Sequence, residues 1–475
     1  MNMRQLDSIR HTVRRLEALA ELLLLTLAYY LVWRACYRGD PLPPYYGLGK
    51  FTLAGVYLAL LWIVMDNDDG LKFGYLKLTG VLLSQWVSLL IVNVVTYFQL
   101  CLIANALIPV LPMLALTALD AAISLVCCYL YTLLYHSMHA PRKMLMIYGD
   151  KRSVTLKVKM DSRSDKYKIS EMISAAEDPA QIKARIRQYR AVVICDVPAE
   201  IRNDILKFCY ANDIRTYITP KVSDVIIRGA ERIHLFDTPL VLVKAGGLNF
   251  EQRFLKRAVD LLLCGIALLI LWPLMLVIAI AIKLEDGGPV FYKQRRVTRY
   301  DKEFDILKFR SMIVNAEQAG ISIPATERDP RITKVGRVIR ATRLDELPQL
   351  LNILKGDMSI VGPRPERVEH VRKYTEEIPE FGFRTKVKGG LTGYAQVFGK
   401  YNTSAYDKLK LDLMYIEQYS LLLDFKLILM TISVLFKKES TEGFDMAITP
   451  EEVLKECAEA EGDDPQGEEK TPAQV

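Results

Sequence analysis

The stretch "LLLCGIALLILWPLMLVIAIAI", residues 261–282, is a run of 22 uncharged residues with Pro273 near its middle. A spanning α-helix needs about 20 apolar residues, so this run is long enough to enter a membrane. A proline inside a helix removes a backbone donor and kinks or breaks the helix. Lys and Arg residues flank both ends, over residues 253–257 and 283–296. Both flanks therefore favour the cytoplasmic side of a membrane.

We interpret residues 254–283 as a re-entrant membrane helix that enters the cytoplasmic leaflet, turns at Pro273 and returns. A plain span is the alternative, and it would place everything after Ile282 outside the cell. Between Lys283 and Arg343, fourteen Lys and Arg residues stand against eight Asp and Glu residues. Such a basic segment suits an anionic membrane face and anionic substrates, which favours the re-entrant form.

The first 140 residues predict an α-helical bundle of about four transmembrane helices, residues 1–140. The chain of 475 residues is 51% hydrophobic and 25% charged, as expected for membrane segments attached to soluble domains. Lys and Arg gather before the first apolar stretch and after the fourth, so both ends of the bundle are expected in the cytoplasm. The stretches are Leu16–Cys36, Phe51–Met65, which is short, Val81–Ile103 and Ile108–Leu134.

Residues 141–247 change to short β-rich runs separated by amphipathic stretches. This alternation predicts a cytoplasmic, Rossmann-like α/β module with a parallel sheet. A dinucleotide-binding fold has a Gly-rich turn after its first strand, because backbone amides must approach the phosphates closely. Here Gly149 stands alone in "YGDKRSV". We therefore expect a structural or sensory role for the module rather than dinucleotide binding.

The stretch "RLDELPQLLNILKGDMSIVGPRPE", residues 343–366, places two adjacent carboxylates, Asp345 and Glu346, just before Pro348. Proline is tolerated in the first turn of a helix, so a helix is expected to begin beside the pair, where its dipole favours anions. One carboxylate can bind Mg²⁺, and the other can attack phosphorus. The alternative is that the pair only caps the helix.

Basic side chains near the pair favour phosphate chemistry. Arginine makes bidentate contacts with phosphate, and the prolines of "GPRP" hold Arg364 with little entropy left to lose. Phosphoryl transfer needs this combination of positioning, charge neutralisation and metal. Residues 248–440 are thus expected to form a mainly α catalytic domain with short strands and a lipid phosphate as one substrate. The acidic tail, residues 441–475, is expected to be disordered.

Seven strings of this chain, in order, resemble the bacterial sugar transferase family. These are the monotopic polyprenyl-phosphate phosphoglycosyl transferases that start exopolysaccharide, capsule and O-antigen repeat units. The resemblance covers about Phe250 to Ile432, and the preceding region resembles the large members, the undecaprenyl-phosphate galactose or glucose phosphotransferases. The strings are "KRAVDLLL", "DGGPVFYKQRRV", "FDILKFRSM", "DPRITKVGRVIR", the 343–366 stretch, "KGGLTGYAQV" and "DLMYIEQYSLLLDFKLILMTI".

The resemblance implies that a UDP-sugar, with glucose or galactose expected, and undecaprenyl phosphate give undecaprenyl-diphosphate-sugar and UMP, with Mg²⁺. It implies that Asp345 is the nucleophile that forms a phosphosugar-enzyme intermediate, and that Glu346, together with Asp345, binds the metal. It further implies a homodimer in the bacterial inner membrane, with its catalytic domain on the cytoplasmic face and no nucleic-acid partner. Substrate-binding roles fall to Lys308, Arg310, Arg337, Arg340, Arg364, Pro365 and Gln396, and structural roles to Pro273 and Asp260.

The chain departs from the family pattern at two positions. Trp272 stands before Pro273 where a small polar residue is usual, and Gly389 replaces the proline of the usual "PGITG", which is expected to loosen that turn. Two rival hypotheses remain. A metal-dependent membrane phosphohydrolase would use the same carboxylates with water as acceptor, and a nonenzymatic membrane scaffold or nucleotide sensor would not need residues 345–366.

Overall fold

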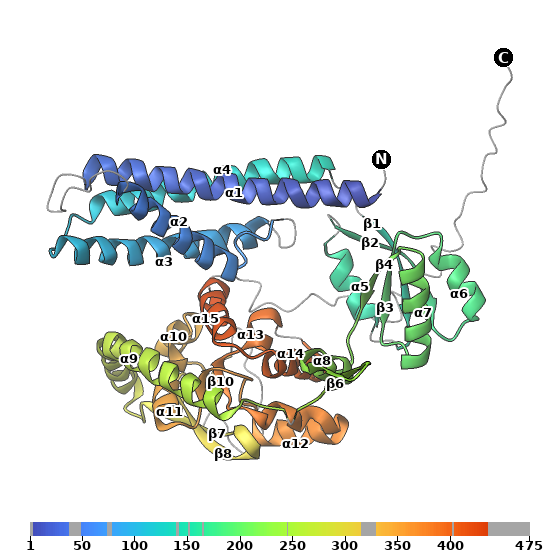
Figure 1. Cartoon of the computed structure of the whole chain (residues 1–475). Helices are drawn as coiled ribbons and strands as arrows, with labels where there is room; N and C mark the ends of the chain where they lie inside the picture. Colours follow the sequence, from blue (N-terminus) through green and yellow to red (C-terminus); the bar gives the residue numbers. More distant parts are fainter. Residues whose placement is uncertain are drawn as a thin grey trace. The chain divides into compact units, whose positions relative to one another are not determined.

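The computed structural model describes residues 3–37, 49–73, 78–138, 142–150, 153–163, 166–244, 246–314, 329–400 and 403–435. The described chain divides into two compact units. One contains the residues up to Tyr129 and those from Asp224 onward, and the other contains Leu130–Ser223. Figure 1 labels most of their helices and strands. The acidic tail, residues 441–475, lies outside the described residues.

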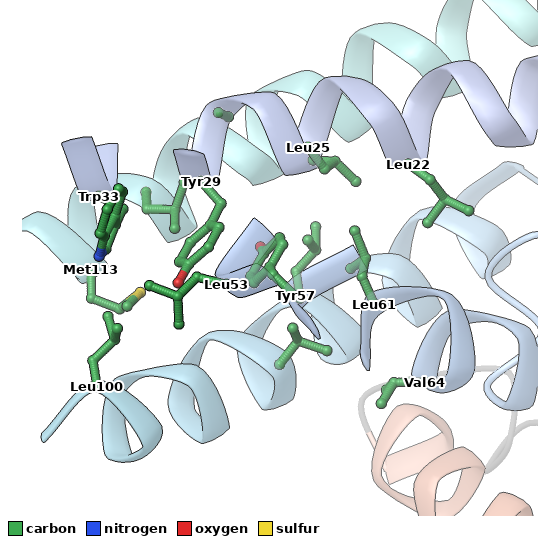
Figure 2. Packing of buried hydrophobic residues seen from close by; sticks show 14 of the residues in the cluster. Leu22, Leu25, Tyr29, Trp33, Leu53, Tyr57, Leu61, Val64, Leu100 and Met113 are labelled. Carbon is green, nitrogen blue, oxygen red and sulfur yellow. The ribbon is translucent and has the colours of Figure 1, made fainter. Parts of the chain in front are cut away.

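The N-terminal region consists of four helices: α1 (Met3–Cys36), α2 (Gly49–Asn67), α3 (Leu78–Ala104) and α4 (Leu111–Met138). Buried side chains of α1 and α2 face one another in Figure 2, where the rings of Tyr29 and Tyr57 stack with centroids 4.2 Å apart. The Tyr57 hydroxyl donates to Asn93 at 2.9 Å, and the Asn93 amide donates to Asp120 at 3.0 Å. These three polar side chains thus bond to one another within an apolar interior.

Four helices of the described chain are long and apolar enough to cross a membrane. Three belong to the N-terminal region, while α2 is a shorter apolar helix over Phe51–Asn67. The fourth is a later helix, α9 (Phe250–Asp286). The four predicted apolar stretches are therefore confirmed as helices, of which α2 falls short of spanning length. The protein is a membrane protein with several candidate spans.

A four-stranded parallel sheet, in the order β2-β1-β3-β4, forms the core of the second unit. Alternate residues of its central strands face two separate apolar cores, which contain α6 and α7 on one face and α5 on the other. The predicted parallel α/β module is confirmed. Its elements are β1 (Arg142–Tyr148), α5 (Ser153–Asp161), β2 (Tyr167–Ser174), α6 (Pro179–Ile186), β3 (Ala191–Cys195), α7 (Ala199–Ala211) and β4 (Arg215–Ile218).

Close packing explains why a glycine stands at position 149, directly after β1. A Cβ at this position would lie 2.4 Å from the carbonyl oxygen of Asp196 in the loop after β3. The glycine therefore allows two loops to cross closely. After α8 (Val222–Gly229), an antiparallel hairpin of β5 (Glu231–Leu235) and β6 (Thr238–Leu242) follows, which the predicted alternation did not include.

The uncharged run of residues 261–282 lies within α9, a single hydrogen-bonded helix that includes Pro273. A capping box begins this helix, in which the Asn249 N–H donates to the side chain of Gln252 at 2.9 Å. Gly287 ends it in the left-handed conformation, with φ 69°. The cap residues thus set both ends of the helix, and Pro273 does not end it.

Both ends of α9 contact the same following domain. Near its start, the Lys256 ammonium lies 2.6 Å from Asp424, and at its end Asp286 pairs with Arg310. Apolar residues of both halves of the helix pack on that domain as well. The helix is therefore anchored to one domain at both ends.

The domain that follows α9 is mostly helical with short strands, as predicted. Its strands form an antiparallel pair and a parallel pair. The strands are β7 (Phe291–Val297), β8 (Glu303–Phe309), β9 (Ser359–Val361) and β10 (Gly390–Thr392). The helices are α10 (Lys334–Ala341), α11 (Gln349–Lys355), α12 (Val368–Glu377), α13 (Tyr394–Phe398), α14 (Ala405–Glu417) and α15 (Leu421–Leu435), with 3₁₀ turns η1 (Arg299–Asp301), η2 (Leu344–Glu346) and η3 (Pro379–Lys386).

Candidate active site

The two adjacent carboxylates lie in the 3₁₀ turn η2, and not in the first turn of an α-helix. The turn follows Arg343, which adopts the left-handed conformation with φ 57°. Helix α11 begins at Gln349, directly after Pro348, whose missing N–H would have no partner within the helix. A tight turn between two helices thus presents Asp345 and Glu346 side by side.

Glu346 is held by two cations. Its Oε1 lies 2.7 Å from the Lys308 ammonium of β8 and 3.1 Å from Nη2 of Arg364. Burial alone would raise the pKa of Glu346, but Arg364 and Lys308 outweigh burial and lower that pKa far below its usual range. Burial lowers the pKa of Lys308, which Glu346 opposes. Glu346 is therefore an ionised carboxylate that organises two positive side chains.

Asp345 differs from its neighbour. It makes no hydrogen bond or ion pair with any residue that the structure describes. Burial raises its pKa, the nearby Glu346 adds to this, and the positive charges of Lys308, Arg340 and Arg343 oppose the shift. Of the two carboxylates, Asp345 is therefore the one that no described side chain holds.

Arg364 is placed by the strand before it and by α9. Asp260 of α9 accepts a hydrogen bond from the Ser359 hydroxyl at 2.7 Å and another from the Ile360 N–H at 3.1 Å. These bonds fix β9, and the Gly-Pro-Arg-Pro segment follows β9 directly. The membrane-associated helix is therefore tied to the segment that carries Arg364.

The other residues predicted to bind substrate have different surroundings. Arg340 contributes positive charge at Asp345, whereas Arg337 is exposed on α10. Arg310 is 7% exposed and pairs with Asp286 at the end of α9, so its substrate role stays a prediction. The Gln396 amide donates to the Leu391 carbonyl at 3.0 Å.

The carboxylates at this site fit a magnesium ion that takes its remaining ligands from water and from a substrate. Among the described residues, no group of three or more His, Cys, Asp and Glu side chains could hold a metal ion. Two carboxylates are nevertheless enough for Mg²⁺, which usually completes its shell with water and substrate phosphate oxygens. Asp345 and Glu346 are the pair that could do so.

Comparison with known proteins identifies the family. The family described as "Bacterial sugar transferase" matches residues 251–438. A "UDP-N-acetylgalactosamine-undecaprenyl-phosphate N-acetylgalactosaminephosphotransferase" of Aeromonas hydrophila is 34% identical over 321 residues, 65% of this chain and 70% of that protein. The chain belongs to the bacterial sugar transferase family.

Two further relatives match a smaller part of this chain. The "UDP-glucose:undecaprenyl-phosphate glucose-1-phosphate transferase" of Escherichia coli (strain K12) is 42% identical over 211 residues, 43% of this chain and 44% of that protein. The "Galactosyl transferase CpsE" of Streptococcus agalactiae serotype III is 41% identical over 226 residues, 43% of this chain and 48% of that protein. The chain thus spans less than half the length of each of these two proteins. The names of the three relatives specify three different sugars.

Sequence reasoning on this sugar transferase missed three arginines near the site. Arg343 adds charge beside Asp345, while Arg296 and Arg384 contact the segment around Arg364. Arg343 was visible as part of a basic string. The other two have no local signal, because their contacts join residues far apart in the chain.

Gly389 replaces the usual family proline, yet its turn is tightly packed. Its N–H donates to the Thr298 hydroxyl at 3.2 Å, and a Cβ would lie 2.5 Å from Cγ of Pro365. We predict that Gly389→Ala lowers the free energy of unfolding by about 1–3 kcal/mol, because the rigid ring of Pro365 cannot move aside cheaply. Thermal unfolding of the purified protein measures this effect.

Gly382→Ala is the matched control, since nothing lies within 4 Å of a Cβ at that position. It should change the unfolding temperature little. Equal effects of the two substitutions would show that the contact with Pro365 is not what restricts position 389.

Proposed function

We propose that this sugar transferase moves a sugar 1-phosphate from a UDP-sugar to undecaprenyl phosphate, giving undecaprenyl-diphosphate-sugar and UMP. Such a step would begin exopolysaccharide, capsule or O-antigen synthesis. The observation that carries the proposal is the contrast between the two carboxylates: Glu346 is held by Lys308 and Arg364, whereas Asp345 has no hydrogen bond or ion pair with a described residue. The names of the Aeromonas and Escherichia relatives support both substrates.

In the proposed mechanism Asp345 is the nucleophile. One of its carboxylate oxygens attacks the β-phosphorus of the UDP-sugar, the bond from that phosphorus to the bridging oxygen breaks, and UMP leaves. An oxygen of undecaprenyl phosphate then attacks the same phosphorus and displaces the Asp345 carboxylate. Lys308 and Arg364 supply fixed positive charge for the phosphate oxygens. Mg²⁺, when bound by Asp345 and Glu346, would neutralise charge on the diphosphate.

We further propose that α9 is re-entrant and that the catalytic domain faces the cytoplasm. The anchoring of both helix ends to one domain, through Lys256–Asp424 and Asp286–Arg310, supports this arrangement. The basic flanks of the helix agree with it. A homodimer in the bacterial plasma membrane stays a prediction of the family resemblance.

A panel of UDP-glucose, UDP-galactose and UDP-N-acetylgalactosamine tests the function. With purified full-length protein in detergent and added polyprenyl phosphate, we expect UMP release that equals the lipid-linked product formed. One sugar should be preferred, since a buried hydroxyl or amide contact commonly discriminates strongly. Release of free sugar 1-phosphate at the same rate without lipid would instead support a phosphohydrolase.

A further inference from the structure

The Gly362–Pro365 segment, which carries Arg364, has an unusual backbone. Pro363 and Pro365 lack an N–H, so the segment can be held mainly through its carbonyl oxygens. Donors from several elements reach carbonyls in and beside it. They are the Tyr415 hydroxyl to Val361 (3.2 Å), the Gly390 N–H to Pro363 (2.9 Å), Arg384 to Arg364 (2.9 Å) and Arg296 to Pro365 (3.1 Å).

Arg384 is the more buried of the two arginines that make these contacts. It is 5% exposed, its guanidinium lies over the ring of Phe381 at 4.9 Å, and its Nη2 lies 2.7 Å from Oδ2 of Asp412. The same Nη2 donates to the carbonyl of Arg364. Its guanidinium is therefore fixed by a ring and a buried carboxylate while it holds the backbone of Arg364.

Arg296 of β7 contacts the next carbonyl along the segment. Its Nη1 donates to Pro365, while its Nε and Nη2 donate to the side-chain oxygen of Gln294 at 3.1 and 2.6 Å. Burial and the nearby Arg364 lower the pKa of Arg296 to about 10. The guanidinium thus lies close to that of Arg364 and is oriented by a neutral amide.

We propose that Arg384 and Arg296 are positioning residues that clamp two consecutive carbonyls, those of Arg364 and Pro365, and so hold the Arg364 guanidinium ready for the phosphates of the UDP-sugar. This inference rests on the proposed function, which assigns Arg364 to the phosphate oxygens of the UDP-sugar. The clamp acts on affinity because a guanidinium that is already ordered loses less entropy on binding. Neither arginine is proposed to touch the reacting atoms.

Arg384→Lys tests the clamp. Lysine keeps a positive charge near Asp412, but it lacks the planar guanidinium that lies over the Phe381 ring and places Nη2 against both Asp412 and the Arg364 carbonyl. We expect the KM for the UDP-sugar to rise about tenfold, with kcat changed less than about threefold and the unfolding temperature nearly retained. Arg372→Lys, on the exposed face of α12, is the control and should change neither constant.

A double-substitution cycle separates positioning from general structural damage. In an Arg364→Ala background, Arg384→Lys should raise KM less than about twofold further, because its effect passes through Arg364. A full additional rise in that background would overturn the proposal, as would an unchanged KM in the folded single variant. If Arg384→Lys does not fold, Arg296→Lys is assayed in the same cycle with the same criteria. An unchanged KM for Arg364→Ala alone would refute the role of Arg364 in binding the phosphates of the UDP-sugar, which is a failure of the proposed function and not of the clamp.

Discussion

Replacing Asp345 by Asn is expected to reduce UMP release at least about 1000-fold, since loss of a nucleophile removes the covalent route altogether. The substitution should not impair folding. Asp345 makes no hydrogen bond or ion pair with a described residue, and burial raises its pKa, so a neutral amide relieves a desolvation cost. UMP release and thermal unfolding, measured on the same preparation, separate the two effects.

Asp305→Asn provides the matched control for this substitution. Asp305 is exposed on β8, the strand that also carries Lys308. Its replacement should leave UMP release near the wild-type rate. Activity of Asp345→Asn within about tenfold of wild type would contradict the assignment of the nucleophile.

Replacing Glu346 by Gln is expected to lower both activity and stability. The amide leaves the positive charges of Lys308 and Arg364 without their shared counter-ion, and it removes one proposed metal ligand. We expect a loss of about 2 kcal/mol in the free energy of unfolding, below the cost in a fully buried pair, because the Arg364 side chain is 39% exposed. Denaturant unfolding measures this loss.

The loss of stability caused by Glu346→Gln should depend on pH. The pKa of Glu346 is lower in the folded protein than in the unfolded chain. Its stabilising contribution is therefore fully present above the pKa of the unfolded chain, and it is lost only as the pH falls toward the pKa of the folded protein. At alkaline pH the stability gap to wild type should narrow, because the pKa of Lys308 is already lowered by burial and the variant can release that proton. A gap that widens as the pH rises from neutral to alkaline would contradict this account.

Glu303→Gln is the control for the ion pair. Glu303 lies 3.3 Å from Arg295, but both side chains are exposed, and such pairs contribute about 0–1 kcal/mol. Its replacement should change stability little at any pH. A loss as large as that of Glu346→Gln would show that the site geometry is not the cause.

The sequence predicted the elements that follow from periodicity and composition. The apolar stretches became α1 to α4 and α9, and the β-rich runs became a parallel sheet. The hairpin β5–β6 was missed because nearly all of its residues are exposed, so burial imposes no alternation on them. A hydropathy pattern indicates which side chains are buried, so a strand that is exposed on both faces produces no recognisable pattern.

The site was predictable only where its residues are adjacent in the chain. Asp345, Glu346 and Arg364 stand in one stretch, and the structure brings Lys308 to them from β8. The 3₁₀ turn that presents the carboxylates depends on Arg343 in a left-handed conformation, which no local residue type indicated. Arg384 contacts Asp412 and Arg364 only because separate elements pack together. Such contacts cannot be predicted from the spacing of residues in the sequence.

The most direct measurement of the central claim traps the covalent intermediate. The full-length protein is incubated, without lipid acceptor, with a UDP-sugar carrying ³²P in its β-phosphate, then quenched and digested for mass spectrometry. We predict a phosphosugar on the peptide that contains Asp345, formed together with UMP, absent from Asp345→Asn and removed by added polyprenyl phosphate. Turnover of wild-type protein with no label on the protein, or with the label on another residue, would contradict the claim that Asp345 attacks the β-phosphorus.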